Sequence, residues 1–114
     1  GSTDSNDGRS SFSNYGECVD IFAPGGSIWS SVSSSDDAFG TKSGTSMSSP
    51  HIAGLAALHL NANPNLTPLE VLDAIVADAT PDVVGNKGSG SPNRLAYADS
   101  IRLGCTPLCG AHEI

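Results

Sequence analysis

The stretch from Ile52 to Leu60 constrains the fold more than any other part of this sequence, because almost every residue in it is apolar. It holds good helix formers, and a helix that is apolar on all sides is buried. Pro50 limits where this helix can begin, since proline is tolerated in a first turn but costs about 3 kcal/mol in a helix interior. We therefore expect a buried helix that begins near residues 46 to 49 and ends at Asn61 to Pro64.

A second helix is predicted from the start signal at Thr67 to Glu70. A threonine at the N-cap, a proline at the first helical position and a glutamate at the third are typical of a capping box, in which side chains bind the free amides of the first turn. Apolar residues then recur on one face, which predicts an amphipathic helix that ends at Thr80-Pro81. The residues of this stripe are Leu69, Leu72, Ile75 and Val76.

The strand signals are short and few. The apolar run Cys18–Ala23, stopped by a Pro-Gly-Gly turn, predicts one strand, and weaker strands are expected at residues 27–32 and 93–97. Residues 1–17 and 33–40 are polar and are predicted to be exposed loops. These elements fit one face of a doubly wound α/β domain with a mainly parallel sheet. Such a sheet needs more strands than these, so we expect the C-terminal part of a larger α/β domain.

Length and charge exclude several classes of protein. At 114 residues the chain is long enough for one domain. Twelve acidic residues against five basic ones give a net charge of -7, which is the wrong sign for a nucleic-acid partner. No apolar stretch reaches the roughly 20 residues that a membrane-spanning helix needs. We expect neither nucleic acid nor a membrane as a partner, and we expect a signal peptide, if there is one, to lie upstream of Gly1 or to have been removed.

The stretch from Gly44 to Gly54 carries the chemistry. It places Ser46 at the start of the apolar helix, where unpaired amides and the positive end of the helix dipole favour negative charge. A hydroxyl there can attack a carbonyl while its own amide donates to the oxyanion that forms. The sequence has eighteen serines, however, and the alternative is that the hydroxyl side chains only cap an ordinary helix. These hydroxyl residues are Thr45, Ser46, Ser48 and Ser49.

The run Gly-Thr-Ser-Met-Ser-Ser-Pro-His-Ile-Ala-Gly at residues 44–54 resembles the active-site serine signature of the subtilisin-like serine proteases. The segments Cys18–Gly25 and Gly88–Leu95 also resemble the proteinase K-like branch, particularly its aqualysin-type members. The resemblance covers residues 1–98. It departs from the usual signature at the two serines after the methionine, where the family usually has Ala and then Thr or Ala. These are small-for-small changes that should not disturb a nucleophile.

This resemblance implies a secreted serine endopeptidase that hydrolyses peptide bonds by acyl transfer. It implies that Ser46 is the nucleophile, that its amide is one oxyanion donor and that Thr45 supports the oxyanion hole. Met47 would be an oxidation-sensitive neighbour or, alternatively, an ordinary apolar residue. The family's Asp and His motifs are absent from these residues and would come from upstream. The chain alone is therefore expected to be inactive. The alternative is a degenerate homologue that acts as a non-catalytic binding or structural module.

None of the three histidines is expected to be the base that activates Ser46. His51 lies five residues beyond it, which turns the ring to a different helix face, and His59 lies about 20 Å further along the axis. We expect His51 to be a hydrogen-bonded structural residue and His59 to lie on the side of the helix. His112, in the C-terminal tail, is expected at the surface.

The three cysteines are Cys18, Cys105 and Cys109, an odd count that leaves one thiol free or paired outside the chain. In aqualysin-type members a cysteine at the position of Cys18 pairs with an upstream one, and the alternative is a buried free thiol. Cys105 and Cys109 could bridge each other or another partner. Cys105, Cys109 and His112 could alternatively bind zinc, although three ligands at this spacing are unfamiliar for a zinc site.

Asp20 has two interpretations. An acid in a half-buried strand needs a partner, and in proteinase K-like enzymes the aspartate at this position binds a structural calcium ion together with upstream carbonyls. The resemblance thus implies calcium at Asp20 in the complete domain and no cofactor for catalysis.

The resemblance also divides the chain into the C-terminal part of a catalytic domain, residues 1–98, and an extension with two cysteines, residues 99–114. The expected partners are a protein or peptide substrate and the N-terminal part of the same domain.

Overall fold

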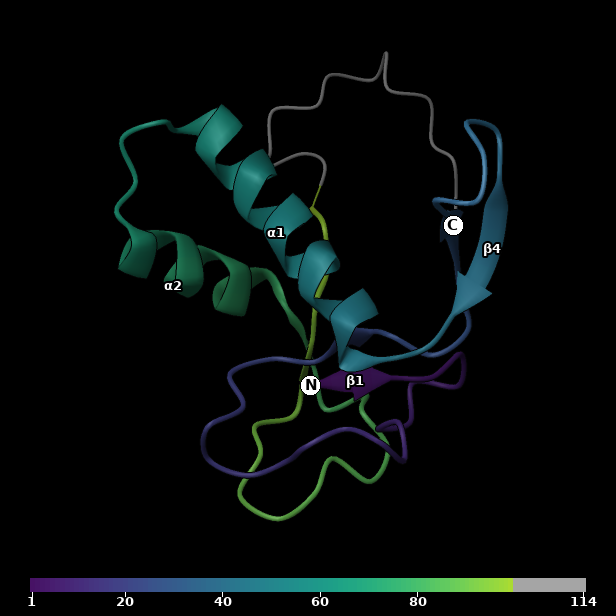
Figure 1. The fold of residues 1–114 in the computed structure, drawn as a ribbon. Coiled ribbons are helices and arrows are strands. Elements are labelled where there is room, and N and C mark those ends of the chain that lie inside the picture. Colours follow the sequence, from purple (N-terminus) through teal and green to yellow (C-terminus); the bar gives the residue numbers. More distant parts are fainter. Residues whose placement is uncertain (100–114) are drawn as a thin grey trace.

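Two helices and three small sheets make up the part of the chain that the structure, a computed structural model, describes, namely residues 1–99 (Figure 1). The helices are α1 (Thr45–Ala62) and α2 (Pro68–Asp78). The strands are β1 (Ser2–Thr3), β2 (Ala23–Pro24), β3 (Ile28–Ser31), β4 (Phe39–Lys42), β5 (Thr80–Pro81) and β6 (Arg94–Leu95). In Figure 1, α2 folds back beside α1, and β1 lies at the amino end of α1.

The segment around β2 is the centre of a small parallel layer. β1 pairs with β2 in parallel on one side. On the other side, the Phe22 amide donates to the Arg94 carbonyl at 2.9 Å, and the Phe22 carbonyl accepts from the Ala96 amide at 2.8 Å. The segment therefore lies between β1 and β6, and Phe22 is fully buried. The strand predicted over Cys18–Ala23 is present only at its C-terminal end.

β3 and β4 form an antiparallel hairpin beside the first turns of α1 (Figure 1). The register places Ile28 opposite Lys42. Across the hairpin the rings of Trp29 and Phe39 stack, with centroids 6.1 Å apart and planes inclined by 10°. β3 confirms the predicted strand at this position, whereas residues 33–40, predicted to be a loop, contain the start of β4. β4 is defined by its pairing with β3 and has no strong strand signal of its own.

Part of the segment 1–17 is buried, which corrects the expectation of an exposed loop. Its buried serines are Ser2, Ser10 and Ser13. The Ser2 amide donates to Ser13 Oγ at 2.9 Å, and the hydroxyl oxygens of Ser2 and Ser10 lie 2.8 Å apart. Small polar side chains can be buried here because their hydroxyl groups serve as hydrogen-bond partners inside the fold.

α2 begins with the capping box that its sequence predicts. The Glu70 amide donates to Thr67 Oγ1 at 3.3 Å, and the Thr67 amide donates to Glu70 Oε2 at 2.7 Å. Two hydrogen bonds from Thr67 to the Glu70 carboxylate lower the pKa of Glu70. The larger effect comes from the Thr67 backbone amide and the smaller one from the Thr67 hydroxyl. Val71 and Ile75 are buried, whereas Leu69 is 73% exposed. The predicted apolar stripe is therefore confirmed at Ile75 and wrong at Leu69, because the side of α2 that packs against the core carries Val71 and Ile75 but not Leu69.

Within the described chain α1 is buried on one side, and burial on all sides stays a prediction for the complete domain. Its buried residues are Ser48, Leu55 and His59. Leu58 and Leu60 are exposed. A Cβ on Gly54 would have no atom of a neighbouring element within 4 Å. The reason is that α1 meets α2 and the β1–β2 layer, and within residues 1–99 these neighbours cover one side of the helix.

The hydrophobic core lies where α1, α2 and the segment before β2 meet. Its buried members are Ile21, Leu55, Val71 and Ile75. This packing holds the amino end of α1 next to β2, which is where the candidate site lies. Neither helix within residues 1–99 has both the length and the apolar character to cross a membrane.

Candidate active site

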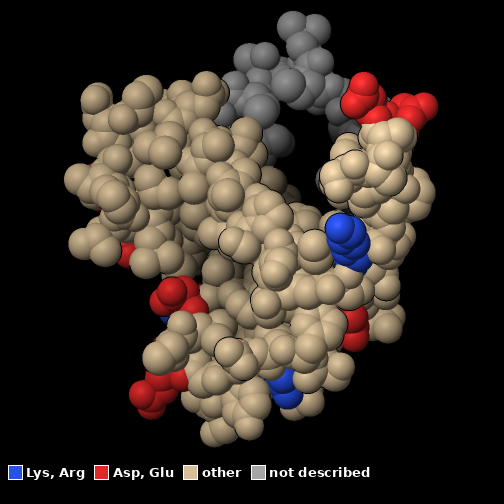
Figure 2. Space-filling model, viewed as in Figure 1, with Lys and Arg blue, Asp and Glu red and all other residues tan. Residues whose placement is uncertain are grey.

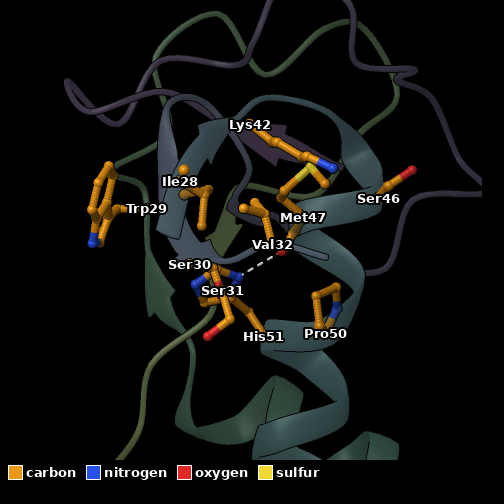
Figure 3. A pocket seen from close by; sticks show the side chains of 11 residues that line it. Ile28, Trp29, Ser30, Ser31, Val32, Lys42, Ser46, Met47, Pro50 and His51 are labelled. Atoms are coloured by element: carbon orange, nitrogen blue, oxygen red, sulfur yellow. Dashed lines mark hydrogen bonds between the residues drawn. The ribbon is translucent and has the colours of Figure 1, made fainter. Parts of the chain in front are cut away.

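Ser46 is exposed in the first turn of α1. Its hydroxyl makes no hydrogen bond with any part of the chain that the structure describes. Figure 3 shows Ser46 at the edge of a pocket, with its oxygen directed outward from the hairpin. A molecule that lies across the amino end of α1 can therefore reach this hydroxyl directly.

The amino end of α1 also presents unpaired backbone amides. Gly44 is the N-cap residue and makes no side-chain cap hydrogen bond. The Met47 amide donates to the Gly44 carbonyl at 2.9 Å, whereas the amides of Thr45 and Ser46 have no acceptor within residues 1–99. Together with the helix dipole, these amides favour a negative charge beside Ser46. The alternative in which serine or threonine hydroxyls cap this helix is wrong, because the cap is a glycine.

Two hydrogen bonds to the β2 segment fix the start of α1. The Gly44 amide donates to the Gly25 carbonyl at 2.8 Å. The buried Ser48 hydroxyl donates to the Ala23 carbonyl at 2.9 Å. Gly25 packs so closely against this turn that a Cβ on it would lie 2.3 Å from the hydroxyl oxygens of Ser2 and Ser48. A glycine after β2 is therefore needed for Ser46 to stand where it does.

A pocket of about 430 Å³ opens between the hairpin and α1 (Figure 3). The residues that line it come from the β3–β4 hairpin and the first turns of α1. They are Ile28, Trp29, Ser30, Ser31, Val32, Gly40, Lys42, Ser46, Met47, Pro50 and His51. Sequence reasoning missed the contribution of Lys42, because the pairing of β3 with β4 brings it to the pocket and no local motif marks it. Figure 3 shows the Trp29 ring on the outer side of the hairpin, directed away from Ser46.

The histidines are held by other groups. The Nδ1 atom of His51 lies 2.7 Å from the Met47 carbonyl oxygen, which confirms a hydrogen-bonded histidine. His59 is buried, and its Nε2 lies 3.7 Å from Asp78 Oδ2, so its ring packs toward α2. His112 lies outside the described residues. Neither described histidine shares a hydrogen bond with Ser46.

Cys18 and Asp20 both lie on the surface. Cys18 is a free thiol and is exposed, which contradicts the alternative of a buried one. Cys105 and Cys109 lie outside the described residues. Among residues 1–99, no group of three His, Cys, Asp or Glu side chains could hold a metal ion. Asp20 therefore does not form a calcium site with the described residues and would need ligands from elsewhere.

This chain belongs to the subtilase family, whose family model matches residues 1–98. It is 54% identical over 97 residues to an extracellular serine proteinase of Thermus sp. (strain Rt41A), a match that covers 85% of this chain and 24% of that protein. It is 49% identical over 113 residues to alkaline serine exoprotease A of Vibrio alginolyticus, covering 99% of this chain and 20% of that protein.

A solved structure has the same fold. It is the crystal structure of a cold adapted subtilisin-like serine proteinase, which matches with a TM-score of 0.79 and 48% sequence identity over 87% of this chain and 36% of that one. The comparisons confirm the family and the α/β fold class that the sequence predicts. The chain spans about a quarter of the length of the Thermus relative.

Proposed function

We propose that this chain carries the nucleophile of a secreted serine endopeptidase, with Ser46 attacking a peptide carbonyl. The observation that carries the proposal is the free hydroxyl of Ser46 at a helix end whose adjacent amides have no acceptor within residues 1–99. Similarity to serine proteinases, one of them named extracellular, supports both the reaction and the secreted location.

In the proposed reaction, Ser46 Oγ forms a bond to the substrate carbonyl carbon while its proton passes to a base. The amide of Ser46, supported from Thr45, donates to the oxyanion that develops. The carbon–nitrogen bond then breaks, and the proton leaves with the amine. Water hydrolyses the resulting ester, which releases the acid and restores the serine hydroxyl.

The base and its orienting carboxylate are proposed to come from the N-terminal part of the same catalytic domain. Both described histidines have other partners, namely the Met47 carbonyl for His51 and Asp78 for His59. Residues 1–114 alone are therefore proposed to be inactive, since a serine without its base loses several orders of magnitude in rate.

Gly44 supports a substrate path beside Ser46. A Cβ on Gly44 would meet no atom closer than 3.6 Å, so packing inside the chain does not require glycine there. A residue without a side chain at this place leaves room for a peptide backbone to approach the amides of the first turn.

Cys18 is proposed to pair with a cysteine outside the described residues, because its thiol is exposed and has no partner cysteine within residues 1–99. Calcium at Asp20 remains a proposal for the complete domain. The division into residues 1–98 and an extension over 99–114 stays a prediction.

Replacing Ser46 by alanine in the full-length product of the gene that encodes this chain tests the proposal. We expect the hydrolysis rate of a peptide p-nitroanilide to fall by at least about 10³-fold. Ser49→Ala is the matched control, because Ser49 is exposed in the same turn and should leave the rate unchanged. Hydrolysis that persists in Ser46→Ala contradicts the proposal. A wild-type protein that hydrolyses no peptide favours a non-catalytic module instead.

A further inference from the structure

We infer that the pocket beside Ser46 receives an acidic side chain of the substrate, and that Lys42 binds its carboxylate. The inference rests on the proposed function and names the class of peptide that the site prefers. It is carried by the position of Lys42, by the charge around it and by the lining of the pocket.

Lys42 is the last residue of β4 and is separated from Ser46 by a short turn. Its backbone position is set by the hairpin register, which pairs it with Ile28. Figure 3 shows the Lys42 side chain running from β4 toward the first turn of α1, with its ammonium group on the side of Met47 and Ser46. A peptide that presents its carbonyl to Ser46 therefore places a neighbouring side chain within reach of this ammonium group.

The charge of Lys42 is not neutralised inside the described chain. The Lys42 side chain makes no ion pair or hydrogen bond with residues 1–99. The nearest acidic residues along the chain, Asp36 and Asp37, lie in the loop that joins β3 to β4. Figure 2 shows acidic groups at the tip of the hairpin, and a basic group at its other end next to α1. The free ammonium group thus makes this end of the hairpin positive in a chain of net charge -7.

The other lining residues suit the stem of an acidic side chain. Lys42 is the only lining residue with a permanent charge, and Ile28, Val32 and Met47 supply apolar surface. The volume of about 430 Å³ is enough for one side chain and the adjoining backbone. An aspartate or glutamate would place its methylene groups on this surface and its carboxylate at Lys42. A lysine or arginine in the same place would meet a like charge.

The test uses two sets of internally quenched peptides. One set varies a residue before the scissile bond and the other a residue after it, and each set carries Asp, Asn or Lys at the varied position. With the full-length enzyme we expect one position at which kcat/KM for Asp exceeds that for Asn by about fivefold, the size typical of an ion pair open to solvent. Lys42→Gln should remove this preference. Lys42→Glu should reverse it, so that Lys is preferred at the same position.

Arg94→Glu is the control, because it changes the net charge by the same amount at an exposed residue of β6. It should leave the preference unchanged. An unaltered preference in Lys42→Glu, or an equal change in Arg94→Glu, overturns the inference, and so does a wild-type enzyme without any acidic preference. The proposed function fails separately, if hydrolysis of the same peptides survives Ser46→Ala.

Discussion

Ser48 shows how a single buried hydroxyl can position Ser46, the proposed nucleophile. As a sequence feature it is a small-for-small departure from the usual family signature. Ser48 lies two residues beyond Ser46. In the structure its hydroxyl donates to the Ala23 carbonyl at 2.9 Å. The bond ties the first turn of α1 to the parallel layer, close to where Gly25 packs against the same turn.

Ser48→Ala should therefore lower the free energy of unfolding. We expect a loss of about 1 kcal/mol, because the buried hydrogen bond from the Ser48 hydroxyl to the Ala23 carbonyl is removed. The measurement is chemical denaturation of the full-length protein in a Ser46→Ala background, which prevents self-digestion. Ser49→Ala, at an exposed position, is the control. Equal stability of the Ser48→Ala and Ser49→Ala proteins would show that this hydrogen bond contributes nothing.

At the scale of elements, the capping box makes the stability of α2 dependent on pH. The pKa of Glu70 is lowered by its hydrogen bonds to Thr67. A carboxylate with a lowered pKa stabilises the folded chain above the ordinary glutamate pKa. This stabilisation is lost as the pH falls through the lower value of the folded state.

Glu70→Gln should therefore destabilise the protein near neutral pH and have little effect at a pH below the folded-state pKa of Glu70. Denaturation of the wild type and the variant at the two pH values measures the difference. Asp73→Asn, which removes a carboxylate from the same helix outside the capping box, is the comparison. A loss of stability in Glu70→Gln that is the same at both pH values would mean that the ionised carboxylate has no part in the cap.

The elements that could be predicted from the sequence are those with local causes. The residues from Thr67 to Glu70 contain both partners of each cap hydrogen bond, so the start of α2 follows from four adjacent residues. The start of β4 and the burial of Ser2 depend on segments that are distant in the sequence. The apolar pattern of α1 predicts burial, but it does not tell which segment covers the helix.

The residues of the candidate site likewise fall into those that the sequence can predict and those that only the fold brings to the site. Ser46 and its amide belong to one contiguous motif, so the sequence is enough to single them out. Lys42 reaches the pocket only through the pairing of β3 with β4. The role of Ser48 was missed because its acceptor, the Ala23 carbonyl, lies on another element.

At the scale of the whole molecule, the described residues bring together the proposed nucleophile, a supporting layer and a charged pocket. The structural match covers 36% of a subtilisin-like serine proteinase. Within residues 1–99, α1 is covered on one side, and no histidine is hydrogen-bonded to Ser46. The reactivity of Ser46 is therefore required to appear only when the rest of the catalytic domain is present.

Covalent labelling with a fluorophosphonate probe, located by mass spectrometry of the digested protein, tests this requirement most directly. We predict that the full-length protein carries the probe on Ser46, and that residues 1–114 alone remain unlabelled. A probe found on any other serine of the full-length protein, or equal labelling of Ser46 in the chain alone, would contradict it.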